Sequence, residues 1–389
     1  MIQSNLYRRF FTPTIVAALL LSTIISCKNS SPNTTLLGDA ENEYATLFAL
    51  RENSDGNRYL AINETWDGNS KVEEYKLVER SERKSGLFAE NEIPVPLNNV
   101  ACMSTTHIAY MAALGKAELI STVSGAQYVS NPIVADRIAK GEVKDFGYEG
   151  AINYELLIMT QPDILITYGV KGQDNQHLKK LKEIGIKHIV IGDYLENHPL
   201  GKLEYIKLFG ALLGCYEKAD SIYRAISERY IQTKEDISTA VEKRTKVVMN
   251  APWKDVWYIP GGNNYMSVLV NDAGGEIIGS REGEDISFPY GLEEIILKAY
   301  EAEYWLSPGS YATMKDLASV SPLFSKLPIF KEEKIFNNTK QDTPGGGSNF
   351  WEKGVVEPDL ILKDLAIILH PEVYPPTAKE ELQYYIELK

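Results

Sequence analysis

The order of apolar and polar positions divides the chain into segments with different periods. Over residues 40–94, short runs of alternating character are broken by the turn sequences SDGN and DGNS, which predicts a small antiparallel β extension. Over residues 95–211, apolar runs such as VACMS and DILIT alternate with helical segments, and this pattern predicts an α/β lobe with a mostly parallel sheet. Residues 244–389 repeat the alternation with the apolar runs TKVVMN, EYWLS and EKIFNN, which predicts a second lobe.

Residues 212–243 carry apolar side chains at a helical spacing. Ala219, Ile222, Tyr223, Ile226 and Tyr230 recur three and four residues apart, so they form one apolar stripe along a helix of about eight turns. A helix of this length between two α/β units would act as a strut. The predicted fold class is therefore α/β, with two Rossmann-like lobes joined by a long α-helix and a small N-terminal antiparallel β extension.

The first residues have the pattern of an export signal. Arg8 and Arg9 precede an apolar run, Ile15 to Ile25, that is too short for a comfortable membrane span and ends in small residues. The sequence IISC that closes the run resembles the bacterial lipobox. We therefore expect a lipoprotein signal peptide over 1–27, lipidation of Cys27 and a tether over 28–39. The alternative is an ordinary signal peptide with an incidental cysteine. Either way the mature protein is expected to be exported, and with the lipid it would be anchored to a membrane of the cell envelope in the periplasm.

Composition limits the partners and the chemistry. Fifty-three acidic against 40 basic residues give a net charge of −13, and this balance disfavours nucleic acid, whose phosphates need a basic surface. Cys102 and Cys215 are too far apart to form a metal motif, but whether they pair or stay as free thiols is left open. The glycine-rich segments lack the residues that follow in a phosphate-binding loop, and no nucleophile elbow is present.

One helix–strand unit occurs twice. NYELLIMTQPDILITYG and YGLEEIILKAYEAEYWLSPG each read as a helix followed by a strand, and each helix begins with an acid, Glu155 or Glu293, with Glu294 as a possible substitute for the latter. On a single copy, such a glutamate is adequately explained by the helix dipole. On two copies at matching places, a common function is the better interpretation.

These features together resemble one family. The IISC lipobox, THIAYMAALG, the two repeated units, LKEIGIKHIVIG, the long helix and DLILKDLAIILHP occur in the order and spacing of the helix-linked (class III) substrate-binding lipoproteins of ABC importers, the ferric siderophore, haem and cobalamin group. The resemblance covers roughly residues 95–374, and the extension lies outside it. It implies a monomeric protein that binds and delivers a ligand without catalysis and holds no resident cofactor or metal.

The resemblance also implies partners and a cargo. Glu155 and Glu293 would dock into arginine pockets of an ABC permease dimer that is driven by a cytoplasmic ATPase. The ligand would be a small metal chelate, with an iron chelate (ferric siderophore or haem) as the first expectation and cobalamin as the alternative. An exported two-lobed α/β hydrolase is the competing hypothesis from another class, and the strut predicts only small movements of the lobes.

Candidate ligand-binding residues are aromatic side chains at predicted strand ends, because ligands of α/β sheets bind beyond the carboxyl ends of strands and broad rings suit a planar chelate or corrin. They are Tyr128, Tyr168, Trp253, Trp257, Tyr258, Tyr311, Phe350 and Trp351. His107 follows the first strand of its lobe and is added as a residue that could touch the ligand. The loop DTPGGGSNF reads equally well as a binding loop or as a plain surface loop.

Overall fold

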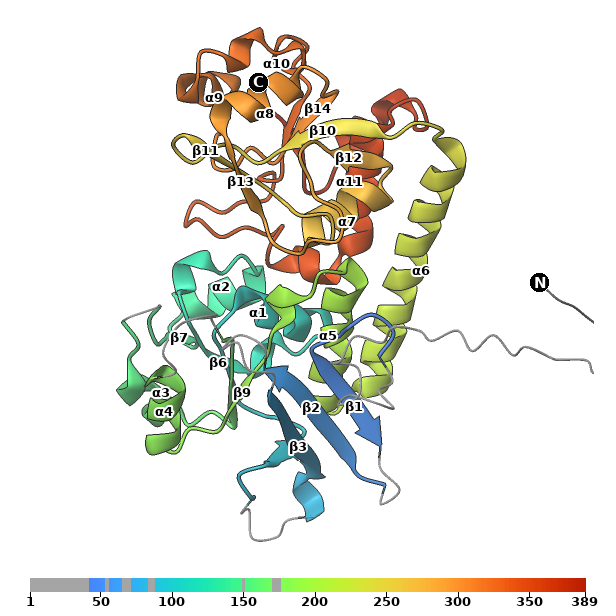
Figure 1. Cartoon of the computed structure of the whole chain (residues 1–389). Helices are drawn as coiled ribbons and strands as arrows, with labels where there is room; N and C mark the ends of the chain where they lie inside the picture. The colour runs from blue at the N-terminus through green and yellow to red at the C-terminus, as the bar shows by residue number, and fades with distance from the viewer. Residues whose placement is uncertain (1–41, 53–55, 65–70, 83–87, 149–150, 170–175) are drawn as a thin grey trace, which may run out of the picture. The chain divides into compact units, whose positions relative to one another are not determined.

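The computed structural model describes residues 42–52, 56–64, 71–82, 88–148, 151–169 and 176–389 (Figure 1). The predicted signal peptide with Cys27 and the predicted tether over 28–39 lie outside these residues. Within the described ranges, no helix is both long and apolar enough to cross a membrane. Residues 39–389 form one compact unit, in which the predicted extension and both lobes share a continuous apolar core.

The first lobe is built on a five-stranded parallel sheet with the order β7-β6-β5-β8-β9. The first strand lies in the middle, so the chain winds outward in one direction and then in the other. This reversal creates a switch point between β5 and β8. The strands are β5 (Val100–Cys102), β6 (Ile120–Val123), β7 (Lys144–Asp145), β8 (Ile164–Thr167) and β9 (His188–Val190), and the helices are α1 (Thr105–Ala113), α2 (Pro132–Ala139), α3 (Tyr154–Thr160) and α4 (Gln176–Glu183).

The second lobe repeats this plan. Its sheet has the order β12-β10-β14-β15-β16, parallel except for the antiparallel edge strand β16, and β10 and β14 form its switch point. A separate antiparallel ribbon pairs β11 with β13. The elements are β10 (Thr245–Met249), β11 (Val256–Ile259), α7 (Tyr265–Asp272), β12 (Gly275–Ile277), β13 (Phe288–Gly291), α8 (Leu292–Ala299), β14 (Tyr304–Leu306), α9 (Met314–Val320), α10 (Pro328–Lys331), β15 (Ile335–Asn337), α11 (Pro358–Leu369) and β16 (Ile386–Glu387).

Two helices connect the lobes. α5 (Pro199–Leu212) ends just before Gly214, whose φ of 68° lets the chain turn into α6 (Tyr216–Ala240). At 25 residues, α6 is about 37 Å long, and it packs against α5 and against α11 of the second lobe (Figure 1). Its buried side chains include four of the five predicted stripe residues, and Ile222 is partly buried against the same core. The long connecting helix of the predicted fold class is therefore confirmed.

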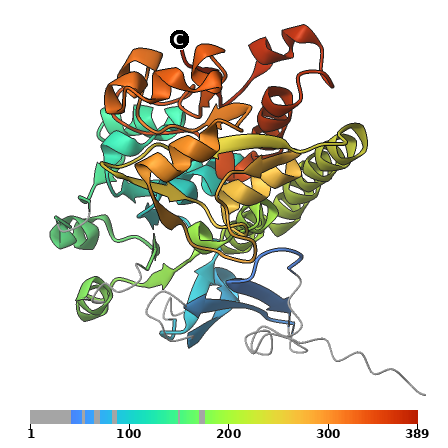
Figure 2. The same ribbon diagram turned by 45° about the horizontal axis from the view of Figure 1, so that its top comes forward.

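The extension is a four-stranded sheet rather than a purely antiparallel one. β1 (Phe48–Glu52), β2 (Arg58–Glu64) and β3 (Lys71–Glu79) pair antiparallel as expected, but β4 (Glu92–Val95) pairs parallel with β3. The three antiparallel strands are those of the predicted extension, whereas β4, which makes the sheet mixed, was not predicted. Figure 2 shows the sheet against α5 and α6, and the rings of Phe48 and Tyr205 lie 4.5 Å apart.

Two buried carboxylates, Glu196 just before α5 and Glu204 within it, hold the start of the extension. The backbone N–H groups of residues 43–45 donate to Glu204, and those of Thr46 and Leu47 donate to Glu196, at 2.7–3.2 Å. Lys207 balances the charge of Glu204, with its Nζ 3.1 Å from the carboxylate and 3.9 Å from the ring centroid of Tyr223. Every residue of α5 is buried, charged ones included, because α1, α6, α7, α11 and β4 of the extension pack around it.

Candidate functional site

The carboxyl ends of the strands in the first lobe carry paired tyrosines. Tyr128 ends the short helix η3 (Ala126–Tyr128) after β6, and its ring centroid lies 5.3 Å from that of Tyr148. Tyr168 follows β8 directly at the switch point, and its ring lies 6.4 Å from that of Tyr194, which follows β9. The sheet topology therefore brings two predicted tyrosines to the same edge and adds a ring partner to each.

The matching edge of the second lobe has an unusual backbone. Asn250 follows β10 and Ser307 follows β14, and both non-glycine residues have a left-handed φ, 64° and 50°. The Nδ2 group of Asn250 donates to the carbonyl of Tyr258 at 3.0 Å, which ties the rim to the β11 ribbon. Such φ values cost energy and concentrate at functional sites, so this edge is the site candidate of the second lobe.

The loop after β15 makes a direct contact between the lobes. The backbone N–H groups of Ser130 and Asn131, at the start of α2, both donate to the carboxylate of Glu352 at 2.7 Å. Glu352 is 1% exposed, and burial raises its pKa to about 7 although the two N–H groups act in the opposite direction.

The glycines of the same loop explain why it can lie so close. A Cβ on Gly345 would collide with the carbonyl oxygen of Gln127, and a Cβ on Gly347 would collide with that of Tyr128. The DTPGGGSNF segment is thus neither a regular element nor a plain surface loop, because it rests on the rim of the opposite lobe. We call the contact of residues 343–352 with residues 127–131 the inter-lobe clasp.

A buried charged group lies deeper between the lobes. The Nζ of Lys202, on α5, is 4.3 Å from the ring centroid of Tyr265, and that ring lies 6.4 Å from the ring of Trp351. Burial lowers the pKa of Lys202, while the charges of Asp193 and Glu196 act against that shift. Among the described atoms, Oδ2 of Asp193 is buried without a hydrogen-bond partner. The polar side chains of Lys202 and Asp193 are therefore buried close to the aromatic residues Tyr265 and Trp351.

Three predicted ligand-binding residues have no usable surface. His107 is fully buried on α1, 6.1 Å between rings from Phe209, and burial lowers its pKa to about 4. Trp257 is fully buried against Trp305, because alternation along β11 points it into the core. Phe350 is buried against residues near the C-terminus. Side chains buried in this way offer no surface to a ligand, which contradicts the choice of these three as candidate ligand-binding residues.

The other predicted residues keep exposed surface. Tyr128, Trp253, Tyr258 and Trp351 are exposed, and Tyr168 and Tyr311 are half-buried. Ring contacts join the tyrosines within the first lobe and Trp351 to Tyr265 within the second, but none among the described rings links Trp253 or Tyr258 to the first lobe.

Sequence reasoning missed several residues of this region. Tyr194 follows the strand KHIVIG, so the expectation that ligand-binding aromatic residues lie at strand ends could have identified it. The positions of Lys202, Tyr265 and Glu352 depend instead on packing between the lobes.

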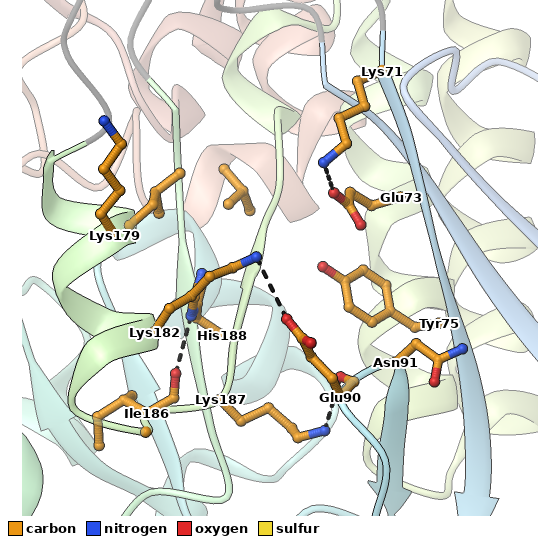
Figure 3. Close-up of a pocket in the computed structure, with 13 residues that line it drawn as sticks. Lys71, Glu73, Tyr75, Glu90, Asn91, Lys179, Lys182, Ile186, Lys187 and His188 are labelled. Carbon is orange, nitrogen blue, oxygen red and sulfur yellow. Dashed lines mark hydrogen bonds and ion pairs between the residues drawn. The ribbon is translucent and has the colours of Figure 1, made fainter.

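A groove of about 870 Å³ lies elsewhere, between the extension and the edge of the first lobe (Figure 3). Its cations are already engaged. Lys187 donates to the carbonyls of Ala89 and Glu90 at 2.9 and 3.1 Å and also to that of Glu92, and Lys182 lies 3.5 Å from the carboxylate of Glu90. These contacts of Lys182 and Lys187 hold the extension on the first lobe, and we call them the seam.

The two predicted docking acids lie at equivalent places on different lobes. Glu155 is exposed in the first turn of α3, and Glu293 is exposed in the first turn of α8. The strand after α3 pairs with β5 and the strand after α8 pairs with β10, so each helix precedes the strand that joins the first strand of its lobe. Neither carboxylate has an ion pair or hydrogen bond with a described residue.

Cys102 and Cys215 are free thiols, and burial raises the pKa of each. Across the described ranges, no group of three or more His, Cys, Asp or Glu side chains is arranged to hold a metal ion.

Two α/β lobes joined through helices, with candidate binding edges at both switch points, define a two-lobed solute-binding protein. The periplasmic binding protein family matches residues 100–341, and the chain belongs to that family. It is a family of binding proteins, so the chain is not an enzyme and the hydrolase hypothesis is set aside.

The chain is also similar to several relatives and solved structures. An uncharacterized lipoprotein of Methanocaldococcus jannaschii is 27% identical over 297 residues, which is 72% of this chain and 67% of the relative. A periplasmic solute binding protein of Veillonella parvula superposes with a TM-score of 0.54 at 16% identity, covering 84% of this chain and 87% of the other. A periplasmic heme binding protein of Pseudomonas aeruginosa gives 0.55 at 18% identity, over 72% and 95%. A periplasmic vitamin B12 binding protein of Vibrio cholerae gives 0.50 at 13%, over 71% and 98%. Identities this low establish the fold alone.

Proposed function

We propose that this protein is the substrate-binding lipoprotein of an ABC importer and captures a bulky, planar metal chelate between its lobes. The observation that carries the proposal is the gathering of exposed or half-buried rings at the carboxyl ends of the strands, with Tyr128 and Tyr168 on one lobe and Trp351 on the other. Flat aromatic surface with polar tips is suited to a chelate whose faces are apolar and whose edge is polar.

An iron chelate is the preferred cargo, and cobalamin is the second candidate. The solved neighbours include proteins titled as binding heme and vitamin B12, which supports this ligand class without choosing within it. Because His107 has no exposed surface, a bound haem iron would be ligated by a rim tyrosine or by no protein group. The cation described at the inner side of the rim, Lys202, is suited to an acidic edge group of the ligand.

The test of the cargo is spectroscopic. The purified domain is titrated with haem, cobalamin and a set of ferric siderophores, and absorbance and melting temperature are recorded. A binder at 100 times its Kd stabilises the folded state by about 2.7 kcal/mol, which is a readily measured shift. If no chelate binds at micromolar concentration, the cargo proposal fails.

Delivery is proposed to occur by docking of Glu155 and Glu293 on a permease dimer driven by a cytoplasmic ATPase. Two like charges at equivalent places on two similar lobes suit a partner with twofold symmetry, and arginine can pair with each carboxylate bidentately. Reversing both charges (Glu155→Lys with Glu293→Lys) should abolish uptake while ligand affinity stays unchanged, because neither residue lies at the aromatic rim. Glu380→Lys, a reversal at another exposed glutamate, is the matched control. Lost ligand affinity in the double variant would contradict the docking role.

The lipid anchor at Cys27 belongs to the same proposal, with the first relative named as a lipoprotein in its support. Cys27→Ser should release the protein from the membrane fraction and abolish incorporation of radiolabelled palmitate. Unchanged labelling would show that the anchor is elsewhere.

A further inference from the structure

We propose that the permease-docking surface has an apolar anchor beside each acid: Met159 on α3 and Leu297 on α8. Each anchor would insert into an apolar pocket next to the basic pocket of one permease subunit. This inference rests on the proposed function and extends it, because it defines what the two faces of the partner must contain besides positive charge.

The first observation is exposure. The side chains of Met159 and Leu297 are 79% and 72% exposed, the two highest values among the exposed large hydrophobic residues in the described part of the chain. Single exposed hydrophobic residues are ordinary on protein surfaces. Here the two extreme cases fall on the two helices that carry the acids, one on each lobe.

The second observation is spacing. Met159 follows Glu155 by four residues, and Leu297 follows Glu293 by four residues. Residues four apart on an α-helix are neighbours on one face, so each helix presents a carboxylate and a large apolar side chain side by side. Ile158 follows Glu155 by three residues and Tyr300 follows Leu297 by three residues, so these side chains, 47% and 50% exposed, enlarge the apolar surface around each acid and anchor.

The third observation is that both helices are turned the same way on their lobes. Two residues after each acid stands a fully buried side chain, Leu157 in α3 and Ile295 in α8. Each helix is followed by the strand that pairs with the first strand of its lobe. The acid and anchor therefore form one surface unit that occurs twice, at topologically equivalent sites.

The arrangement matches a partner with two equivalent halves. A carboxylate alone on a wet surface gives little affinity because water and salt screen it, whereas a neighbouring apolar side chain that becomes buried adds affinity and excludes water from the charged pair. A single membrane or a single soluble peptide would not need the same pair of groups on both lobes. A permease built from two like subunits would.

The test is site-specific photo-crosslinking of the full-length lipoprotein in its native host. The photoreactive residue p-benzoyl-phenylalanine is placed at 155, 159, 293 or 297, with position 231 on α6, an exposed isoleucine without a neighbouring docking acid, as the control. We expect 159 and 297 to crosslink to an integral membrane permease subunit, of the same kind at both positions, and 231 to give no such product. The products at 159 and 297 should disappear when Glu155→Lys and Glu293→Lys are introduced together.

The outcomes separate this inference from the function on which it rests. Permease products at 155 and 293 without any at 159 or 297 would overturn the anchors and leave the docking proposal standing. No permease product at any of the four positions would overturn both. In a second measurement, Met159→Ser with Leu297→Ser should reduce the yield at 155 and 293 by more than tenfold, because each buried anchor is worth about one decade of affinity. An unchanged yield in that variant would also reject the anchors, and an unchanged melting temperature shows that the variant is folded.

Discussion

The inter-lobe clasp gives the sharpest test of how the two lobes are held. Glu352 reaches from the second lobe to two backbone N–H groups at the start of α2, both at 2.7 Å, and its side chain is buried. Glu352→Ala removes the acceptor of both hydrogen bonds. Glu352→Gln keeps the shape of the side chain but removes its charge and its titration.

The expected size of the effect follows from these contacts. A hydrogen bond to a charged group contributes about 1.5–3 kcal/mol, but removing the carboxylate also removes its own cost of burial. A net loss of about 2 kcal/mol from lobe contact is therefore expected for Glu352→Ala, which is roughly a 30-fold increase in the open fraction.

The Glu352 carboxyl group should also make the closure of the lobes depend on pH. Burial raises the pKa of Glu352 to about 7 in the closed form, whereas in an open, hydrated form it would return to its usual value of 4.5. The closed form therefore binds the proton more tightly, and closure takes up a proton between these two values. Closure should be favoured about tenfold more at pH 6 than at pH 8, which is the opposite of the trend for a salt-bridged carboxylate.

The assay is hydrogen–deuterium exchange of the peptide that contains Ser130 and Asn131, with each rate divided by the intrinsic rate at that pH. Protection in the wild type should rise from pH 8 to pH 6, fall about 30-fold in Glu352→Ala, and lose its pH dependence in Glu352→Gln. Glu380→Ala, at an exposed glutamate, should change nothing. Wild-type protection in the alanine variant would mean that the clasp does not hold the lobes, and the reasoning would be refuted.

Three further outcomes are expected from other contacts. Gly347→Ala should reduce the exchange protection of the Ser130–Asn131 peptide, because its Cβ would collide with the carbonyl oxygen of Tyr128. The control Gly291→Ala, whose Cβ would have open space around it, should leave that protection unchanged. Equal protection in the two variants would contradict this expectation. Lys187→Met should lower the free energy of unfolding in urea by about 2 kcal/mol, because three backbone carbonyls lose their donor. The control Lys182→Met, which removes an exposed ion pair with Glu90, should lower it by less than about 0.5 kcal/mol. Equal losses in the two variants would show that Lys187 does not hold the extension on the first lobe. Glu204→Gln should lower the free energy of unfolding by about 1–3 kcal/mol in thermal unfolding, because it weakens the hydrogen bonds from the backbone of residues 43–45. Lys207 keeps Asp220, 3.6 Å from its Nζ, as a second ion-pair partner, and a cost below about 0.5 kcal/mol would show that Glu204 does not hold the extension.

The sequence predicted the elements that are buried on both faces. Runs such as DILIT and TKVVMN read as strands because parallel strands between layers are apolar throughout, and all of them are found in the two sheets. The elements that it missed are short or lie at edges, such as β7 with two residues and the β11–β13 ribbon. Their local sequence contains too little apolar periodicity to distinguish them from loops.

The candidate site was predictable where a residue follows a strand directly, as Tyr168 does. It was not predictable where neighbours in sequence point in opposite directions. Trp257 and Tyr258 are adjacent, yet the strand buries one and exposes the other. Which of the two faces the core depends on the pairing of β11 with β13, which the local sequence does not specify. Phe350 and Trp351 differ for another reason, since the pocket that takes Phe350 is built by Tyr384 and Tyr385 from the end of the chain.

The complete burial of α5 has a practical consequence for anyone who shortens this protein. A version that begins at Val100, where the family match starts, would lack the main-chain donors that satisfy Glu196 and Glu204. It would also expose to water a part of α5 that is buried in the whole protein. Such a fragment should misfold or aggregate even though it retains both lobes. A secretable soluble form therefore has to begin no later than Asn42.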